Sequence, residues 1–478
     1  MITHTATALD GRRPPGMLPI PPTLRRKYAV RSAGHRGPAG ERARRGAGAG
    51  LTRLFSRLGR VATNDELFAR AQRVIPGGVN SPVRAFKAVG GTPYFVARAD
   101  GAHVWDVEGR RYLDLVQSYG AIIAGHAHPI VVEAVQRAAL DGTSYGAPTE
   151  REVLLAEAIR ERVASVEMVR LVSSGTEATM SAIRAARGFT GRPTVVKFAG
   201  NYHGHGDLLL AEAGSGLAAL GLPGSAGVTE SAVRDTLVVP YNVVPSLDER
   251  TACVIVEPVA ANMGLVPPLP GFLEGLRAEC DRVGALLVFD EVITGFRVAL
   301  GGAQELFGVR ADLTTMGKVI GGGLNVGAYG GRADVMGVVA PLGPVYQAGT
   351  LSGNPLATAA GLAVLGLLDD EAYARLRRTA ATLAARLRQA FDSAGVPARV
   401  PVVSTLVGLF LGDEAPVDYE TARRTDEKRY AALFHGLLDR GVALAPGAYE
   451  VLFPGLAHTD DIVAEIGSAA VEAARDAA

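Results

Sequence analysis

The chain of 478 residues has few cysteines and no long apolar run, and each shortage excludes a class of protein. Its two cysteines, Cys253 and Cys280, are too few for a disulfide framework and are typical of the reducing cytoplasm, where we expect this protein. No apolar run reaches the roughly 18 residues that a membrane span needs. The contents of 48% hydrophobic and 20% charged residues are those of a globular protein, and the length favours two domains.

Acidic residues are scarce in residues 1–60, which hold thirteen of the 49 Lys and Arg residues but only Asp10 and Glu41. This segment is rich in Arg, Gly, Pro and Ala, and it lacks the apolar region of a secretory signal. We predict a disordered extension, or a translation start placed too early, rather than a targeting or nucleic-acid-binding arm. The remaining residues carry a net negative charge, which argues against a core that binds nucleic acid.

The alternation of elements from Asn64 onwards predicts an α/β fold. NDELFARAQRVIPGG predicts a capped helix closed by Pro76 and Gly77, and residues 94–115 predict a small antiparallel meander. From about residue 124, helical stretches alternate with aliphatic runs that lack polar alternation, as in a parallel sheet covered on both faces. Beyond a helix that begins near Pro355, a long amphipathic helix, short strands and a last helix predict a second, smaller domain.

Lysine is also scarce, and Lys318 stands in an otherwise uncharged, glycine-rich run, LTTMGKVIGGG. A buried ammonium is costly unless it is paired or neutral, and a neutral amine is a nucleophile for aldehydes. Upstream, the apolar run LLVF ends in Asp290. A pyridoxal-phosphate (PLP) enzyme needs such a carboxylate to hold the pyridinium nitrogen protonated and such an amine to form a Schiff base. The alternative is a lysine that reaches solvent from a surface turn.

Two further motifs could bind the phosphate and the ring of such a cofactor. Ser174, Gly175 and Thr176 lie between an apolar run and a helix, where backbone N–H groups and a hydroxyl can bind an anion, although Ser174 could equally be an ordinary N-cap. In NYHGHGD, Tyr202 could stack on a planar ring. We predict no metal there, because two histidines at i, i+2 fit poorly on one face of a helix. Thr350, in AGTLSGNP, could donate to another phosphate oxygen.

Together these motifs resemble those of the glutamate-1-semialdehyde 2,1-aminomutase family, PLP enzymes related to the class III aminotransferases. The resemblance runs from about Asn64 to the C-terminus and rests on DEVITGFR, LTTMGKVIGGG, YQAGTLSGNPLA, VRLVSSGTEATMSA, VKFAGNYHGHGD, VIVEPVAANMG and GVNSPVRAF. It implies PLP-dependent transferase fold type I, which is aspartate-aminotransferase-like, with a mostly parallel seven-stranded sheet in the large domain and a small α+β domain. We therefore divide the chain into the extension (1–60), an N-terminal segment that contributes to the small domain (61–123), the large PLP-binding domain (124–365) and the C-terminal small domain (366–478).

The resemblance also implies a role for individual residues toward the cofactor. Lys318 would form the Schiff base and move protons, and Asp290 would pair with the pyridine nitrogen. The ring would lie between Val292 and Tyr202, with its hydroxyl at Asn262. The phosphate would bind Ser174, Gly175 and Thr176, joined by Thr350 of the partner subunit in an obligate homodimer.

For the substrate, the resemblance implies that Ser81 and Arg84 hold its carboxylate, for which a bidentate arginine is chemically apt. Tyr119 and Glu450 would line the substrate pocket, and Ser215 would lie on a mobile loop that closes the site. The small-molecule substrate would be glutamate-1-semialdehyde, (S)-4-amino-5-oxopentanoate.

The implied activity is an isomerase reaction, an intramolecular amino exchange that yields 5-aminolevulinate for tetrapyrrole (porphyrin) biosynthesis. The working cofactor would be pyridoxamine phosphate, with no external amino acceptor. Three departures from the family pattern concern the substrate: Tyr119 stands where the family has Trp, Asn325 where it has Pro, and APGAYEVLF where it has APSAFEAGF. They leave open a class III aminotransferase or an aminomutase acting on another amino acid. A protein with this fold that binds ligand without turnover is a further alternative.

Overall fold

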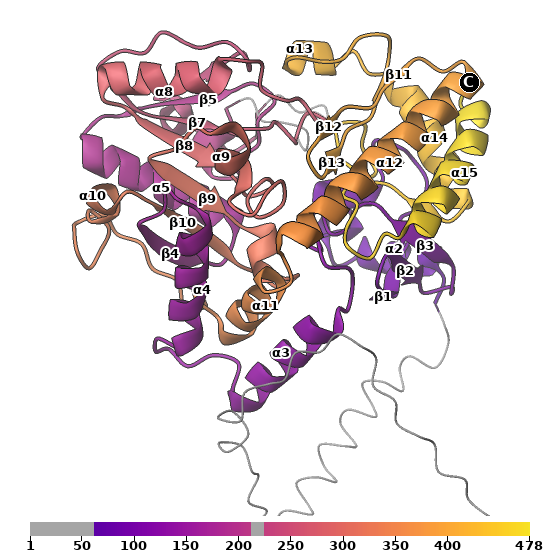
Figure 1. The fold of residues 1–478 in the computed structure, drawn as a ribbon, viewed down its shortest axis with the longest axis horizontal. Helices are drawn as coiled ribbons and strands as arrows, with labels where there is room; N and C mark the ends of the chain where they lie inside the picture. The colour runs from indigo at the N-terminus through magenta and orange to yellow at the C-terminus, as the bar shows by residue number, and fades with distance from the viewer. Residues whose placement is uncertain (1–61, 212–223) are drawn as a thin grey trace, which may run out of the picture. The chain divides into compact units, whose positions relative to one another are not determined.

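The structure is a computed structural model that describes residues 62–211 and 224–478, built around a seven-stranded sheet (Figure 1). The strand order is β4-β10-β9-β8-β7-β5-β6. β10 runs antiparallel to both its neighbours, and the other pairs are parallel. The mostly parallel sheet is therefore confirmed. Its strands are β4 (Met168–Val172), β5 (Thr194–Phe198), β6 (Thr236–Val239), β7 (Thr251–Val256), β8 (Leu286–Asp290), β9 (Leu313–Met316) and β10 (Gly327–Gly331).

Both faces of this sheet are covered, as the aliphatic runs predicted. In β7, Cys253 and Ile255 pack in one cluster with helix α5 (Gly175–Thr190), whereas Val254 and Val256 pack in another with helix α8 (Phe272–Val283). Successive side chains of a strand point to opposite faces, so α5 and α8 lie on opposite sides of the sheet. The run ACVIV has no polar alternation because neither face meets water.

Strand β10 was not predicted, because its sequence GAYGG has few residues that favour strands. Here the absence of side chains is what the packing requires. A Cβ added at Gly331 would lie 2.0 Å from the carbonyl oxygen of Asp312, and one at Gly327 would lie 2.2 Å from that of Ser174. The glycines of β10 therefore allow its backbone to pack closely against neighbouring carbonyl groups.

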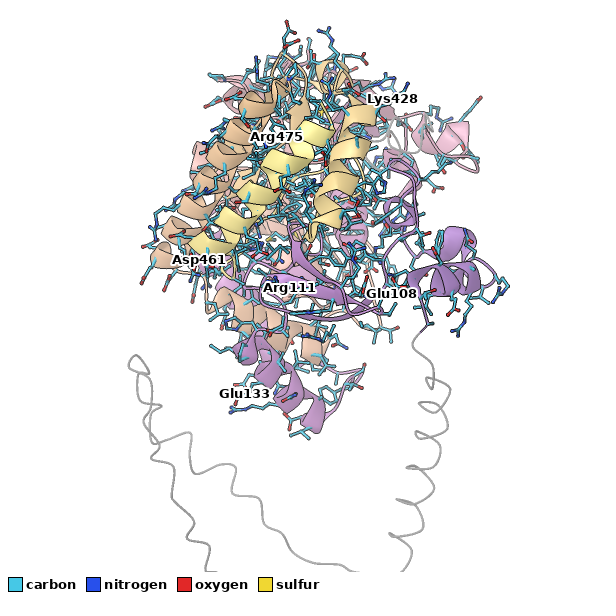
Figure 2. The ribbon with its side chains drawn as sticks, turned by 90° about the vertical axis from the view of Figure 1, so that its right-hand side faces the viewer. Glu108, Arg111, Glu133, Lys428, Asp461 and Arg475 are labelled. Carbon is cyan, nitrogen blue, oxygen red and sulfur yellow. The ribbon has the colours of Figure 1, made fainter. Side chains whose placement is uncertain are left out.

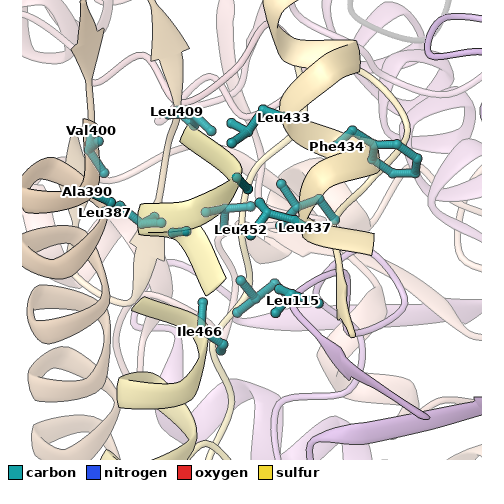
Figure 3. Close-up of a cluster of buried hydrophobic side chains, with 14 of the residues drawn as sticks. Leu115, Leu387, Ala390, Val400, Leu409, Leu433, Phe434, Leu437, Leu452 and Ile466 are labelled. Atoms are coloured by element: carbon teal, nitrogen blue, oxygen red, sulfur yellow. The ribbon is translucent and has the colours of Figure 1, made fainter. Parts of the chain in front are cut away.

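A second sheet joins the two ends of the described chain, in the order β1-β2-β3-β15. The strands β1 (Val96–Asp100), β2 (His103–Asp106) and β3 (Arg111–Asp114) form the predicted antiparallel meander, and β15 (Val442–Ala443) pairs with β3 in parallel. A hydrophobic cluster beside it combines side chains of the N-terminal and C-terminal segments (Figure 3). Its members include Leu115, Leu387, Leu433, Leu452 and Ile466.

The predicted C-terminal helices are present. They are α11 (Pro355–Leu365), α12 (Asp370–Ala394), α14 (Glu427–Asp439) and α15 (Asp460–Asp476). Helix α15 carries charged side chains at both ends, and Figure 2 shows Asp461 and Arg475 near opposite ends of it. An acidic residue in the first turn and a basic residue in the last turn interact favourably with the helix dipole. No helix among the described residues has the length and hydropathy that a membrane span needs.

The first predicted helix is shorter than expected. Helix α2 (Asn64–Ala71) begins at a capping box between Thr63 and Glu66 but ends before Pro76, where a 3-10 turn (Pro76–Gly78) follows. The remaining helices are α3 (Pro129–Asp141), α4 (Glu150–Arg162), α7 (Glu230–Val233), α9 (Gly302–Phe307), α10 (Ala333–Met336) and α13 (Tyr419–Ala422). The remaining strands are β11 (Ala398–Arg399), β12 (Val402–Val403), β13 (Leu406–Val407) and β14 (Phe410–Leu411). Further 3-10 turns are Pro82–Ala85, Asp207–Leu209 and Lys318–Gly321.

Gly331→Ala should destabilise the protein, because its Cβ would meet a backbone oxygen that cannot move aside without disturbing β9 and β10. We expect a loss of about 1–3 kcal/mol in the free energy of unfolding, measured by denaturant titration. Gly412→Ala is the matched control, because nothing lies within 4 Å of its added Cβ. Equal stability of the two variants would contradict the account of β10.

Candidate active site

Five strand ends meet at one edge of the large sheet. Strands β4, β5, β7, β8 and β9 share one direction, so their carboxyl ends lie together, as ligand sites do in open α/β sheets. At or shortly after each of these ends, one residue lines a cavity of about 230 Å³: Ser174, Tyr202, Glu257, Asp290 and Lys318. The topology thereby brings together residues that are up to 144 positions apart in the sequence, from 174 to 318.

Asp290 is the last residue of β8, and its side chain is buried with both carboxylate oxygens hydrogen-bonded. Oδ2 lies 2.7 Å from Nδ1 of His203, and Oδ1 accepts from the hydroxyl of Thr315 (3.0 Å) and the backbone N–H of Val292 (3.1 Å). A buried carboxylate is costly without such partners. Three donors therefore keep the carboxylate in one orientation at the cavity wall.

His203 is the residue of this site that the sequence interpretation missed. Its ring is fully buried, and burial lowers its pKa, while Asp290 opposes that change. The neutral ring carries its proton on Nδ1, where it can donate to Asp290. The sequence suggests His203 only as a metal ligand. Among the described residues, no group of three or more His, Cys, Asp or Glu side chains could hold a metal ion. The signal that could have found it is its position just after β5, whose end lies close to that of β8.

Lys318 lines the same cavity, two residues after β9. Its backbone is left-handed, with a φ of 47°, which is uncommon for a residue with a side chain. Burial lowers the pKa of the Lys318 ammonium, although Asp290, Glu257 and Glu450 each act to raise it. The side chain opens onto the cavity and therefore does not match the alternative of a lysine on a surface turn.

The start of helix α5 forms one wall of the cavity. Ser174 is its N-cap, and the Ser174 hydroxyl accepts a hydrogen bond from the N–H of Glu177 (3.1 Å). The alternative that Ser174 is an ordinary N-cap therefore agrees with the structure. Gly175 and Thr176 are the first helical residues, whose N–H groups have no acceptor within a helix. These groups and the positive end of the helix favour an anion such as a phosphate. A Cβ at Gly175 would lie 3.1 Å from Val292, so this wall leaves no room for a larger residue.

Glu257 fixes the opposite wall, and the sequence interpretation did not single it out. It accepts from the N–H groups of Tyr202 (2.7 Å) and Ala261 (2.8 Å) and from the side chain of Asn262. Burial raises the pKa of Glu257 to about 7. The predicted stacking residue Tyr202 and the predicted partner of the ring hydroxyl, Asn262, are thus held by one carboxyl group. Its place directly after β7, in VIVEPV, was the available signal.

The predicted substrate residues Arg84, Tyr119 and Glu450 are not part of the lining of this cavity. Charges link them to Lys318 through effects on the pKa values of Glu450 and Tyr119. Burial raises the pKa of Glu450 to about 7, and Lys318 opposes this rise. Burial raises the pKa of Tyr119 as well, where Glu450 acts in the same direction and Arg84 in the opposite one. The structure therefore groups Lys318, Glu450, Tyr119 and Arg84.

Arg84 lies in the 3-10 turn Pro82–Ala85, whose N-cap is Ser81. Its side chain is exposed and makes no ion pair within the described part of the chain. A guanidinium without a carboxylate partner, close to Tyr119, is available to an anionic ligand. Asn325, one of the departures noted above, is exposed and does not line the cavity.

One predicted cofactor residue, Thr350, does not line the Lys318 cavity of its own chain. Thr350 is exposed and lines a different hollow of about 360 Å³, which is formed by residues 144–149 together with Glu152 and residues 349–355. Its proposed contact was with the cofactor of a partner subunit, and this stays a prediction. Ser215 lies outside the described residues.

These residues fit PLP: a hydrogen-bonded carboxylate for the ring nitrogen, a lysine with a lowered pKa, and a helix start for the phosphate. The sequence profile described as "Aminotransferase class-III" matches residues 86–472. The chain therefore belongs to the class III aminotransferases, and it uses pyridoxal phosphate.

Relatives of known name narrow this family further. The chain is 54% identical over 422 residues to "Glutamate-1-semialdehyde 2,1-aminomutase" of Laribacter hongkongensis, which covers 87% of this chain and 98% of that protein. It is 56% identical over 400 residues to the protein of the same name from Syntrophobacter fumaroxidans, and the match covers 82% of this chain and 92% of that protein. Within the class III family it thus groups with the glutamate-1-semialdehyde 2,1-aminomutases, as its motifs predicted.

Solved structures support the same fold. An omega-transaminase from Sphaerobacter thermophilus superposes with a TM-score of 0.80 at 34% identity, over 88% of this chain and 99% of that one. A glutamate-1-semialdehyde aminomutase from Pseudomonas aeruginosa PAO1, in complex with PMP, superposes with a TM-score of 0.76 at 26% identity, over 86% and 93%. Fold type I is therefore confirmed.

Lys318→Ala should lower kcat by about 10²–10⁴-fold or more while the protein still binds the cofactor, because the contacts to its ring and phosphate remain. Turnover and cofactor absorbance are the two measurements. Borohydride reduction of the wild type followed by peptide mapping should find the cofactor attached to Lys318. Attachment to Lys197 instead would overturn the assignment, and exposed Lys428→Ala serves as the control that keeps full activity.

Proposed function

We propose that the protein is a PLP-dependent glutamate-1-semialdehyde 2,1-aminomutase, an isomerase that converts (S)-4-amino-5-oxopentanoate into 5-aminolevulinate for tetrapyrrole biosynthesis. The observation that carries the proposal is the series Lys318, Glu450, Tyr119 and Arg84, which begins in the cofactor cavity and ends at a guanidinium that forms no ion pair with any residue of 62–211 or 224–478. A substrate with reactive groups at one end and a carboxylate at the other fits this series. The names of the relatives at 54% and 56% identity support the same reaction.

Each residue of the site has a separate role in the reaction. When bound, PLP in its pyridoxamine form supplies the transferable amino group and the electron sink for the carbanion. Asp290, oriented by His203 and Thr315, holds the proton of the ring nitrogen in place. Lys318 carries protons on Nζ, because burial lowers the pKa of its ammonium and so makes the proton easier to release. Arg84 binds the substrate carboxylate through its planar fork.

The geometry of Arg84 suits an internal amino exchange. In such a reaction the carboxylate lies several bonds from both carbons that exchange the amino group. A contact at that end can therefore hold the molecule while each carbon in turn faces Lys318. Ser81, at the N-cap of the same 3-10 turn, is placed to assist Arg84.

A homodimer is part of the proposal, with Thr350 of the partner subunit at the phosphate. Its support is that Thr350 does not line the cavity of its own chain, and that large apolar side chains of the same region are exposed: Leu342 by 68%, Tyr346 by 72% and Leu351 by 54%. Exposed apolar side chains gathered in one region mark an interface.

The domain division given above and a cytoplasmic location also belong to the proposal. The division is supported by the sheet β1-β2-β3-β15 and the cluster of Figure 3, which unite segment 61–123 with segment 366–478. The location is supported by Cys253 and Cys280, which are both free and buried.

A second candidate is a class III aminotransferase that acts on another amino acid. It is favoured by Tyr119, which stands in the substrate part of the site where the family motif has Trp, and by the similarity to the omega-transaminase. This enzyme would need an external keto acid to complete its cycle. The aminomutase needs none.

The decisive assay supplies glutamate-1-semialdehyde to the purified protein without any keto acid. We expect sustained formation of 5-aminolevulinate, detected over many turnovers per active site, because an internal exchange returns the cofactor to its starting form. A single turnover that resumes only after a keto acid is added would favour the aminotransferase. Exposed Lys428→Ala provides a variant with an intact site.

Arg84→Lys tests the carboxylate contact. It keeps the positive charge but loses the bidentate fork, so KM for glutamate-1-semialdehyde should rise by about tenfold, while the cofactor remains bound. Steady-state kinetics give KM, and the absorbance of the cofactor shows whether it remains bound. A lower melting temperature with an unchanged KM would show instead that Arg84 only supports the fold, and would remove Ser81 from the substrate site with it.

A further inference from the structure

The segment that presents Tyr119 has an unusual backbone. Gln117, Ser118 and Tyr119 have φ angles of 45°, 53° and 56°, and Gly120 follows at 93°. Three successive left-handed residues that carry side chains are unfavourable, because each Cβ crowds the following carbonyl oxygen. Such a run persists only where the surrounding structure determines it, and such sites cluster where proteins function.

A buried carboxylate holds the start of this left-handed turn. Asp114, at the end of β3, accepts from the N–H groups of Val116 (2.9 Å) and Gln117 (3.2 Å), and it lies 2.7 Å from Nε2 of His126. The side-chain amide of Gln117 donates both to this carboxylate (3.3 Å) and to the carbonyl oxygen of Asp114 (3.0 Å). Gln117 is thus tied through its backbone and its side chain to one residue.

The far end of the turn packs against the segment that follows Glu450. A Cβ added at Gly120 would lie 2.7 Å from the ring of Phe453, so the turn is in close contact with that ring. The N–H of Phe453 donates to the carbonyl oxygen of Leu115 (2.8 Å), and the guanidinium of Arg297 lies 5.4 Å from the ring centre. Because Glu450 is only three residues before Phe453, one segment positions both Glu450 and the turn.

The position of the Gln117 side-chain amide costs the folded protein some stability. Its side chain is fully buried, and its Oε1 has no hydrogen-bond partner among the described residues. A buried acceptor without a partner costs stability, as does the positive φ of the same residue. The arrangement fixes the position of the next residues, of which Ser118 is exposed and Tyr119 lies within the electrostatic influence of Glu450 and Arg84.

We propose that Asp114 and Gln117 are positioning residues that hold the left-handed turn and so set the ring of Tyr119 near Arg84 and Glu450. The role acts through Tyr119 on the part of the site that receives the substrate. The choice of substrate rests on the proposed function above, whereas the position of the ring does not.

The test compares Gln117→Ala with Gln117→Gly. Alanine loses the amide and keeps the Cβ that disfavours a positive φ, so the turn should relax and displace Tyr119. Glycine loses the same amide but adopts a positive φ freely. We expect kcat/KM for glutamate-1-semialdehyde to fall about ten- to a hundredfold for alanine and by less for glycine, mainly through KM. Equal KM values for both variants and the wild type would overturn the proposal, and the glycine variant decides the question if the alanine variant does not fold.

Asn242→Ala is the matched control. Asn242 also has a positive φ, 66°, and its amide also ties backbone groups, donating to Pro267 (3.2 Å) and Val417 (2.6 Å) and accepting from Leu269 (2.8 Å). It does not line the cofactor cavity. Its loss should lower the melting temperature while kcat/KM stays within about twofold. A similar rise of KM in this control would show that the Gln117 effect is one of general stability.

Two further measurements separate positioning from a merely structural role. In a Tyr119→Ala background, Gln117→Ala should have no further effect on kcat/KM, because the residue through which it acts is gone; fully additive losses would contradict the proposal. A crystal structure of Gln117→Ala should show Tyr119 displaced, and an unmoved ring would overturn the proposal for any substrate. If the wild type itself does not convert glutamate-1-semialdehyde, the proposed function fails, and the crystal structure alone decides the positioning role.

Discussion

The buried carboxylate of Asp290 is the constraint on which the rest of the site depends. An ionised group can remain at the end of β8 only if donors surround it, and those donors come from three places: His203 after β5, Thr315 in β9 and the backbone of Val292. The order β9-β8-β7-β5 is what brings these donors within reach. A change of strand order would leave Asp290 with only the nearby N–H of Val292, so the topology of the sheet and the chemistry of the site are linked.

Much of this could be read from the sequence, and the reasons are specific. Lys318 and Asp290 stand out because a charged residue in an apolar or glycine-rich run has few explanations, and the runs around Cys253 and Leu287 predicted strands buried on both faces. His203 and Glu257 could not be assigned in the same way. Their partners, Asp290 and Tyr202, are 87 and 55 residues away, and only the order of the strands in space makes them neighbours.

Backbone conformation was the least predictable property. Strand β10 consists of residues with low strand propensity, and its glycines are required by backbone oxygens of Asp312 and Ser174 that belong to other elements. The left-handed turn at Gln117 has no glycine until Gly120, so nothing in its composition indicates a positive φ. In both places the local preference is overridden by tertiary contacts, and a sequence pattern reports only the preference.

The charges in and beside the cavity suggest why its protein groups are arranged around a cofactor rather than around one another. Three carboxyl groups, Asp290, Glu257 and Glu450, act electrostatically on the Lys318 ammonium. If all three were ionised, two negative charges would be uncompensated in a poorly solvated space. Burial raises the pKa of Glu257 and of Glu450 to about 7, so these two hold their protons below neutral pH, while Asp290 has its three donors. With PLP bound, Asp290 would receive the protonated pyridine nitrogen, and the start of α5 would hold the phosphate. The site thus offers a carboxylate at one end and the positive end of a helix at the other, and these two features match the cationic ring and the anionic phosphate of PLP.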